Sequence, residues 1–452
     1  MKTIKVILTA LIFLLSVQIH SQTFQWRVLP NSPLAGTSLR FEDIYFIDPN
    51  TGWIINFING VYKTTNGGNT WGLITDSTFA YGFRSIGFFD ANTGIFGTLY
   101  TDSNNFLYKT TNGGSNWAPV TNVPSPQPEG ICGISIVNEN IGFACGRFFD
   151  TGRIIKTTDK GVSWELVFND SSLAKTLIDC YFWTADSGIA VGGYSTNNNF
   201  EVGNAVVIKT TNGGTSWQRV HKTTRTGEWC WKIHFINRQV GYVSIEKYAN
   251  PTFILKTVNG GNSWQEISLP TNITNLEGIG FLNENTGWVG GWGTNYSFPS
   301  YETTNGGSNW HLAGWGINVN RFRFLNDTLA YAVGDRVYKY SREPVGIHNI
   351  SNEIPGSFSL FQNYPNPFNP VTKIKFDVTR DVRSETQDIK LLVFDVLGKE
   401  VVTLVNEKLP PGSYEVELDG GNFTSGVYFY RISAEANGKS TFIETRRMIL
   451  LR

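Results

Sequence analysis

Charged residues are scarce in this chain of 452 residues. They make up 16% of it, and 37 basic residues stand against 37 acidic ones. Nucleic-acid binding requires a concentrated basic surface, so this balance argues against nucleic acid as a partner. Amphipathic helix periodicity is also lacking, whereas glycine (47 residues) and aromatic residues (14%) are plentiful. This composition is typical of an all-β protein rich in turns.

Cysteine and histidine are rare as well. No two of the four cysteines have the Cys-x-x-Cys spacing of a zinc site, so we expect neither a metal nor a cofactor. Cys132 and Cys145 flank a turn on adjacent predicted strands, where a disulfide or two small buried side chains would fit. The histidines are scattered and suggest no catalytic triad; they are His20, His221, His234, His311 and His348.

Only the start of the chain has a long apolar run. Lys2 and Lys5 precede apolar residues 6–17, a run too short to span a bilayer, and cleavage is plausible after Ser21. No cysteine follows the run, so a lipid anchor is not expected, and no later stretch could cross a membrane. The sequence therefore predicts a signal peptide at residues 1–21 and an exported mature chain without a transmembrane segment.

A nine-residue phrase recurs six times between residues 63 and 310. It reads KTTNGGNTW from Lys63, and its other copies begin at Lys109, Lys156, Lys209, Lys256 and Glu302. The copies end at Trp71, Trp117, Trp164, Trp217, Trp264 and Trp310, which are 46, 47, 53, 47 and 46 residues apart. A period of this length with strand and turn residues inside each unit predicts the four-stranded blades of a β-propeller.

The chemistry of the phrase indicates a structural role. Asn-Gly and Gly-Gly supply the positive φ angles of a tight hairpin, and hydroxyls such as those of Thr65 and Thr111 can bond turn amides. The side chain of Asn66 or Asp159 can do the same. Each closing tryptophan is expected to bury apolar surface between neighbouring sheets. We therefore interpret all six phrases as scaffold.

A second phrase gives the number of blades. Two apolar strands around a short polar turn precede each copy of the first phrase, as in IYFIDPNTGWII from Ile44, and a seventh pair begins at Phe322. The seventh unit stops at Ser341, before its own fourth strand. Residues 26–29 match the missing strand. The sequence therefore predicts seven blades, with the N-terminal strand closing the ring.

These phrases resemble the Asp-box group of propellers. That group includes photosystem II assembly factors, sortilin-type receptors, sialidases and xyloglucan-cleaving glucanases, and the photosystem assembly factor type is the most similar. Asparagine replaces the usual aspartate in five of the six copies. In Asp-box families the motif lies on the outer part of each blade, away from the channel, which agrees with a scaffold role.

The last part of the chain has a different character. Residues 342–357 contain prolines and no apolar alternation, which predicts a linker. Residues 358–452 alternate in a strand-like manner between proline and glycine turns, which predicts a small immunoglobulin-like β-sandwich. The expected domains are a signal peptide (1–21), a seven-bladed propeller (22–341), a linker (342–357) and a C-terminal domain (358–452).

Residues 358–452 resemble the type A C-terminal sorting domain of cargo for the type IX secretion system. The resemblance includes the Asp395-x-x-Gly398-Lys399 turn and the stretch 448–452. It implies passage through the periplasm, contact with the type IX machinery, and release or display at the cell surface. The other matching positions are Tyr364, Pro365, Asn366, Pro367, Gly412, Gly426 and Tyr428.

Candidate ligand-binding residues come from the repeat alignment. Propeller ligands usually lie over the channel, on loops that lead into the innermost strands. Aligning the repeats places eight suitable side chains there: Arg40, Glu42, Arg84, Trp229, Trp231, Lys232, Glu277 and Arg321. Their arginines could clamp a carboxylate, as in sialidases, although sialidase propellers have six blades.

Two functions follow from these residues. The first is a non-enzymatic propeller that binds a glycan or a protein through channel residues and aromatic loops at 192–205, 221–232 and 290–302. The alternative is a sialidase-like or glucanase-like glycoside hydrolase, which requires two carboxylates about 5–10 Å apart. Glu42 and Glu277 belong to different blades, and the sequence does not give their separation. We expect the non-enzymatic function.

Overall fold

The protein is described here from a computed structural model. It covers residues 24–451, apart from 30, 38, 59, 76–80, 101–104, 147–150, 196–201, 248–250, 271–272, 274, 294–296, 342–347, 352, 381–385, 421–422 and 437–438. The predicted signal peptide lies outside the described residues. The chain divides into two compact units, one of residues 24–341 and one that contains residues 342–452. Throughout the described part the regular elements are strands, and no helix there could span a membrane.

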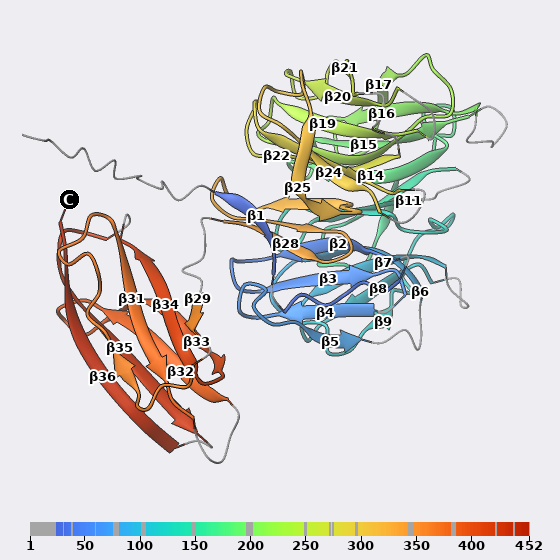
Figure 1. The fold of residues 1–452 in the computed structure, drawn as a ribbon. Helices are drawn as coiled ribbons and strands as arrows, with labels where there is room; N and C mark the ends of the chain where they lie inside the picture. Colours follow the sequence, from blue (N-terminus) through green and yellow to red (C-terminus); the bar gives the residue numbers. More distant parts are fainter. Residues whose placement is uncertain are drawn as a thin grey trace, which may run out of the picture. The chain divides into compact units, whose positions relative to one another are not determined.

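The first unit has seven four-stranded antiparallel sheets among its described residues (Figure 1). Blade 1 contains β2 (Phe41–Phe46), β3 (Gly52–Asn56), β4 (Gly60–Thr64) and β5 (Gly72–Thr75). Blade 2 contains β6 (Tyr81–Phe88), β7 (Gly94–Tyr100), β8 (Leu107–Thr110) and β9 (Ala118–Pro119). Blade 3 contains β10 (Gly133–Ile136), β11 (Gly142–Gly146), β12 (Arg153–Thr157) and β13 (Glu165–Phe168).

The later blades repeat this order. Blade 4 contains β14 (Thr176–Phe182), β15 (Gly188–Tyr194), β16 (Asn204–Thr210) and β17 (Gln218–Lys222). Blade 5 contains β18 (Trp229–Phe235), β19 (Gly241–Glu246), β20 (Phe253–Thr257) and β21 (Gln265–Ser268). Blade 6 contains β22 (Leu276–Phe281), β23 (Gly287–Gly291), β24 (Pro299–Thr303) and β25 (His311–Ile317). Blade 7 contains β26 (Arg321–Phe324), β27 (Ala330–Val333), β28 (Val337–Ser341) and β1 (Gln25–Val28).

The N-terminal strand closes the ring, as the sequence predicted. β1 pairs with β28 in the register Trp26 to Tyr340, and Figure 1 shows the two ends of the propeller side by side. The Trp26 ring stacks on Trp315 of blade 6, with 4.6 Å between ring centroids. The first strand of every blade lies beside the first strand of the next, and β26 lies beside β2. The propeller therefore has seven blades around one channel.

Aromatic stacking joins neighbouring blades. The last aromatic residue of an inner strand stacks on the second strand of the preceding blade, as Phe88 does on Trp53 with ring centroids 3.5 Å apart. Phe46 of blade 1 stacks in the same way on Tyr331 of blade 7, at 3.8 Å. The stacking between neighbouring blades is therefore also present where blade 7 meets blade 1 and the ring closes.

The Asp-box turns differ from the sequence interpretation in one detail. The hydroxyl that bonds the turn belongs to the first threonine of the phrase, not to Thr65 or Thr111. The Thr64 Oγ1 accepts from the Gly68 amide at 2.9 Å, and Thr110 repeats this bond with Gly114. The first threonine is the buried last residue of a strand, so its side chain points under the turn while the second one is exposed.

The second unit has two four-stranded antiparallel sheets. Their orders are β29-β34-β31-β30 and β33-β32-β35-β36. Side chains from both sheets form one apolar core, which includes Phe376, Leu391 and Tyr430. The strands are β29 (His348–Ser351), β30 (Ser359–Leu360), β31 (Val371–Val378), β32 (Gln387–Phe394), β33 (Glu400–Leu409), β34 (Gly412–Asp419), β35 (Gly426–Ala436) and β36 (Lys439–Leu450).

The predicted linker is one point where the structure differs from the expectation. β29 lies inside residues 342–357 and pairs with β34, so this segment adds a strand to the sandwich. Four residues are too few to show apolar alternation, and the pairing with β34 depends on a partner some 65 residues away. Sequence periodicity therefore could not reveal it.

The residues that resemble the sorting domain connect the start of this unit with its last strand. The Asn366 Oδ1 accepts from the Ile449 amide at 3.0 Å, and the Phe368 amide donates to the Ile449 carbonyl at 2.9 Å. Tyr364 is 81% exposed. Asp395 forms the predicted turn, because its Oδ1 accepts from the Lys399 amide at 3.0 Å. The Pro-Asn-Pro phrase thus braces β36 while Tyr364 remains at the surface.

Candidate functional site

The first strands of the blades line the channel, and several of them carry a bulge. The register of β2 shifts between Phe41 and Asp43, and β6, β14, β18 and β22 shift at the corresponding place. A bulge inserts a residue and re-aims its side chain. Glu42 and Asp43, although consecutive, therefore both bond to side chains from other inner strands. The bulges place two layers of polar residues in the channel.

The first layer, which we call the strand-start cluster, contains Arg40, Glu42, Arg84, Glu277 and Asn320. Arg40 bridges two carboxylates, since its Nε lies 3.2 Å from Glu42 and its Nη2 lies 2.5 Å from Glu277. Arg84 forms a second ion pair with Glu42. Burial opposes ionisation of Glu42, but Arg40 and Arg84 outweigh it and lower its pKa. All of these side chains are buried, so the cluster is a closed network of paired charges.

Two indoles cover the guanidinium groups of this cluster. The Arg84 guanidinium lies 4.9 Å from the Trp231 ring centroid, and the Arg40 guanidinium lies 4.6 Å from that of Trp292. The Trp231 Nε1 donates to the Asn320 Oδ1 at 2.9 Å, while the Asn320 Nδ2 donates to Glu42 at 2.9 Å. These contacts hold the arginines in fixed positions, because each is both ion-paired and stacked.

Glu246 and Glu277 form a pair of interacting carboxyl groups beside the cluster. The Trp229 Nε1 donates to Glu246 at 2.7 Å. Burial, and then the Glu277 carboxylate, raise the pKa of Glu246 to about 8. Burial also raises the pKa of Glu277, against the opposing effect of Arg40. Glu246 therefore retains its proton to a higher pH than an exposed carboxyl does.

The second layer, which we call the mid-strand cluster, contains Asp43, Asp179, Lys232 and Arg321. Arg321 joins blades 1, 4 and 7: its Nε lies 3.0 Å from Asp43 and its Nη1 lies 2.8 Å from Asp179. Burial opposes ionisation of Asp179, but Arg321 and Lys232 lower its pKa. A single guanidinium, that of Arg321, therefore connects carboxylates of blades 1 and 4 across the channel.

Lys232 is the unusual member of the mid-strand cluster. Its side chain is fully buried, and its Nζ has no hydrogen-bond partner among the described residues. Burial, and then repulsion by Arg321, lower its pKa to about 8, although Asp179 acts in the opposite direction. Lys232 thus contributes a buried charge that is only partly compensated.

The structure places the eight candidate residues of the sequence analysis around the channel, with Lys232 in the mid-strand cluster. Arg40, Glu42, Arg84, Trp231 and Glu277 meet in or against the strand-start cluster. Trp229 binds Glu246 nearby, and Arg321 belongs to the mid-strand cluster. That they bind a ligand remains a prediction. Sequence reasoning missed Asp43, Asp179, Glu246 and Asn320.

The sequence patterns that could have indicated the missed residues were weak or absent. Asp43 and Asp179 occupy the same place in the repeat as Arg321, so a full alignment of this position could have found them. Glu246 ends the second strand of blade 5, and no rule about inner strands points to it. Asn320 immediately precedes β26 and is buried with its side chain toward Glu42.

Cysteines and metal-binding groups add no further site. All four cysteines are buried and free, so Cys132 and Cys145 are the two buried side chains of the second alternative. Burial raises the pKa of Cys132 to about 12, which disfavours the thiolate. Among the described residues, no three His, Cys, Asp or Glu side chains are grouped in a way that could hold a metal ion.

The strands that flank the long loops of the sequence analysis end or begin at the end of the channel where the inner strands begin. The connections β15–β16 and β23–β24 follow second strands, and β17–β18 leads into an inner strand, so all three reach that end. Trp292, from β23–β24, covers Arg40 as described above.

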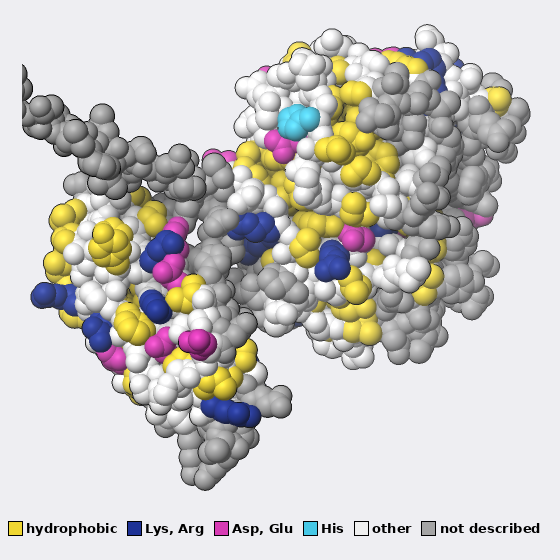
Figure 2. Space-filling view, viewed as in Figure 1, with side chains coloured by type: hydrophobic (Ala, Val, Ile, Leu, Met, Phe, Trp, Pro, Cys, Tyr) yellow, Lys and Arg dark blue, Asp and Glu magenta, His cyan; other side chains and the backbone are white. Residues whose placement is uncertain are grey.

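On the surface drawn in Figure 2, charges of both signs are interspersed. That face shows no continuous basic patch.

Comparison with known families identifies both units. Residues 362–444 match the family described as a secretion system C-terminal sorting domain. Residues 21–172 match the family described as photosynthesis system II assembly factor YCF48. The chain is therefore a BNR-like β-propeller with a type IX sorting domain, exported to the cell surface or the extracellular space. A search of curated proteins finds no match.

Solved structures support the propeller fold. YCF48 from Cyanidioschyzon merolae is 17% identical with a TM-score of 0.51, over 70% of this chain and 98% of that one. YCF48 bound to a D1 peptide is 17% identical with a TM-score of 0.50, over 70% and 94%. The GH74 enzyme of Niastella koreensis is 14% identical with a TM-score of 0.50, over 78% of this chain and 59% of that one. At these identities the likeness concerns the fold alone.

Proposed function

We propose that this exported propeller is a non-enzymatic binding protein, and that its ligand docks at the end of the channel where the inner strands begin. The ligand is a glycan or a polypeptide segment. The strands that flank three long connections end or begin here, beside arginines that ion pairs and indoles hold in place. A prearranged surface of this kind favours binding because little ordering is required. The peptide named in the YCF48 complex supports a polypeptide ligand.

The observation that carries the proposal is the state of the candidate carboxylates. Glu42 accepts from Arg40, Arg84 and Asn320, so its charge is neutralised and its oxygens are occupied. Glu277 is bound by the same Arg40 guanidinium. A catalytic carboxylate must reach the reacting atoms or a water molecule. These buried, paired groups stabilise the channel instead.

A binding experiment tests this proposal. The mature chain is applied to glycan and peptide arrays, and every hit is measured again with Trp292→Ala. Trp183→Ala serves as the matched control, because Trp183 is also half-buried but follows the end of β14, toward the other end of the channel. We expect Trp292→Ala alone to weaken binding at least tenfold. Equal affinity of all three proteins for every hit would contradict the proposal.

A glycoside hydrolase is the second candidate, and one observation favours it. Burial and the neighbouring Glu277 carboxyl raise the pKa of Glu246, and a carboxyl that retains its proton beside a second carboxyl is what such enzymes require. The test measures hydrolysis of sialosides, β-glucans and aryl glycosides. We expect none above background. Turnover that Glu246→Gln or Glu277→Gln abolishes would establish the enzyme instead.

We also propose that residues 358–452 suffice for passage across the outer membrane. The test uses a host with a type IX system. A chain that ends at Ser357 is expected to accumulate in the periplasm as a folded propeller, whereas an inert reporter with a signal peptide and residues 358–452 is expected outside the cell. Surface delivery of the truncated chain at the normal level would contradict this.

A further inference from the structure

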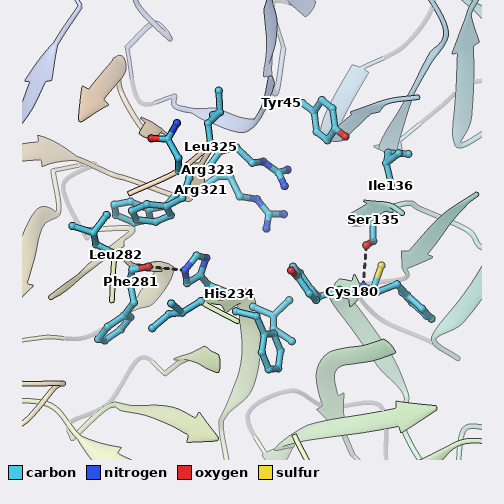
Figure 3. A pocket seen from close by; sticks show the side chains of 18 of the residues that line it. Tyr45, Ser135, Ile136, Cys180, His234, Phe281, Leu282, Arg321, Arg323 and Leu325 are labelled. Atoms are coloured by element: carbon cyan, nitrogen blue, oxygen red, sulfur yellow. Dashed lines mark hydrogen bonds between the residues drawn. The ribbon is translucent and has the colours of Figure 1, made fainter. Parts of the chain in front are cut away.

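A cavity of about 520 Å³ opens at the other end of the channel. It is lined where the inner strands end, by residues of β2, β10, β14, β18, β22 and β26. Its polar lining includes Tyr45, Ser135, Tyr181, His234 and Arg323, and the mid-strand cluster reaches it through Arg321 (Figure 3). We call this cavity the strand-end pocket. Its volume suits a small molecule.

Arg323 gives the strand-end pocket a cation that is not fully paired. Its Nε donates to the Ile44 carbonyl at 3.2 Å, and its Nη2 lies 3.9 Å from Asp43, beyond hydrogen-bond distance. Its guanidinium lies 5.0 Å from the Tyr45 ring centroid, and its side chain is 31% exposed. By contrast, Arg321 is fully engaged by Asp43 and Asp179. The terminal nitrogens of Arg323 are therefore available to an anion.

The carboxylates closest to the pocket are already paired with another arginine, so Arg323 contributes the main charge that is not fully paired. Asp43 and Asp179 are both hydrogen-bonded to Arg321, and Lys232 lies in the same cluster. The exposed side chain of Asp327 is the acidic group among the lining residues. A guanidinium fork matches a planar carboxylate, which it binds with two parallel hydrogen bonds.

His234 adds a hydrogen-bond acceptor to the lining. Its Nε2 lies 2.8 Å from the Phe281 carbonyl, and a carbonyl oxygen can only accept, so Nε2 carries the proton. Burial lowers the pKa of His234 to about 4, although the Phe281 carbonyl opposes this. The ring is therefore neutral and its Nδ1 has a lone pair. That lone pair can accept from a ligand hydroxyl.

Tyrosine rings and hydroxyls complete the lining. Tyr45 and Tyr181 project from β2 and β14, in blades 1 and 4. Burial raises the pKa of Tyr181, although Arg323 and Arg238 act against it, so its hydroxyl keeps its proton as a donor. Aromatic rings beside donors and acceptors suit a ring-shaped molecule with several hydroxyl groups.

We propose that the strand-end pocket binds a small hydroxylated carboxylate of the size of one or two acidic sugar residues. Arg323 pairs with the carboxylate, Tyr45 and Tyr181 contact the sugar ring, and His234 accepts from a hydroxyl. The site is separate from the one under "Proposed function", because the mid-strand cluster lies between the two ends of the channel. One site can therefore fail its test while the other passes.

The experiment is a calorimetric titration of the mature chain with galacturonate and digalacturonate. Galactose is the neutral control, since it has the same ring hydroxyls and a hydroxymethyl group in place of the carboxylate, and acetate is the carboxylate without a sugar ring. We expect the acidic sugars to bind and both controls to bind at least tenfold more weakly. Added salt should weaken the binding of acidic sugars, because an ion pair contributes to it.

Variants locate the site. Arg323→Gln is expected to weaken galacturonate binding at least tenfold, and Tyr181→Phe, which keeps the ring, several-fold. Arg336→Gln is the matched control, since Arg336 lies in the same blade between β27 and β28, at the other end of the channel, and is exposed. If Arg323→Gln lowers the melting temperature, Arg323→Lys replaces it, because it keeps the charge but loses the fork. Unchanged affinity in the folded Arg323 variant, or equal binding of galactose and galacturonate, would overturn the proposal.

Discussion

The outer turns and the inner strands of the propeller belong to the same repeat, but the turns keep one hydrogen bond in all six copies, whereas an inner position differs between blades. In each of the six Asp-box turns a threonine Oγ1 accepts from a glycine amide, at 2.8 to 3.0 Å. On the inner strands, one repeated position carries five different residue types across the seven blades. It is occupied by Asp43, Ser85, Gly133, Asp179, Lys232, Gly278 and Arg321.

This difference separates stability from candidate function. An outer turn has the same surroundings in each blade, so one set of hydrogen bonds serves all copies. The inner positions face one another across the channel, and a charge there needs a partner from another blade. Arg321 pairs with Asp43 and Asp179 because blades 7, 1 and 4 carry different residues at this position of the repeat. A repeat position whose residue varies between blades therefore indicates the candidate site.

The largest effect should come from opening the ring. Deleting residues 23–29 removes β1 and the Trp26 ring from blade 7, so it exposes the edge of β28. We expect the free energy of unfolding to fall by several kcal/mol, since a strand's apolar burial and its ladder are lost. Urea denaturation measures this. An unchanged midpoint would show that ring closure does not depend on β1.

Replacing Arg321 and Arg323 in turn should distinguish a charge that is buried and paired in the channel from one that is partly exposed. Arg321→Met leaves Asp43 and Asp179 buried without their cation, at a cost of about 3–5 kcal/mol in unfolding free energy. Arg323→Met, in the same strand, should cost less than about 1 kcal/mol because Arg323 is partly exposed and weakly paired. Similar losses for both variants would mean that the mid-strand cluster contributes no special stability.

Lys232 should give stability a distinct dependence on pH. Its pKa is 10.5 when exposed and about 8 in the folded protein, so between these values the unfolded chain binds more protons. The unfolding free energy of the natural protein should therefore rise across this window, by up to about 3 kcal/mol. Lys232→Met should lack this rise. Parallel stability curves for the two proteins from pH 7 to 11 would argue against a depressed pKa.

The smallest effect should come from a single outer turn. Thr110→Val removes the acceptor of the buried Gly114 amide and should cost about 1–2 kcal/mol. Thr111→Val is the matched control: it changes the neighbouring threonine, which is exposed, and should change stability by less than about 0.5 kcal/mol. Chemical denaturation of both variants provides the comparison. A larger loss for Thr111→Val would reverse the assignment of the turn hydroxyl.

Local patterns predicted much of the architecture. Seven repeats, the closing strand at residues 26–29 and the sorting domain could be read from the sequence, because each contains a recognisable phrase. Residues 26–29 match the fourth strand of the other units, although their partner β28 is distant in the chain. The choice between Thr64 and Thr65 could not be read in this way, since both hydroxyls are near the turn. β29 was missed because its four residues match no such phrase and its partner β34 is distant in sequence.

The sequence by itself determined where each inner strand begins, because the repeat fixes that position, and so it predicted most of the residues around the channel. Only the tertiary structure decided how they pair: closing the ring brings Arg40 of blade 1 to Glu277 of blade 6, and a bulge lies where Asp43 turns toward Arg321. The strand-end pocket likewise exists only in the folded ring, since six different strands line it. Local spacing sets the direction of a side chain, whereas its partner across the channel depends on ring closure and burial, which no segment contains alone.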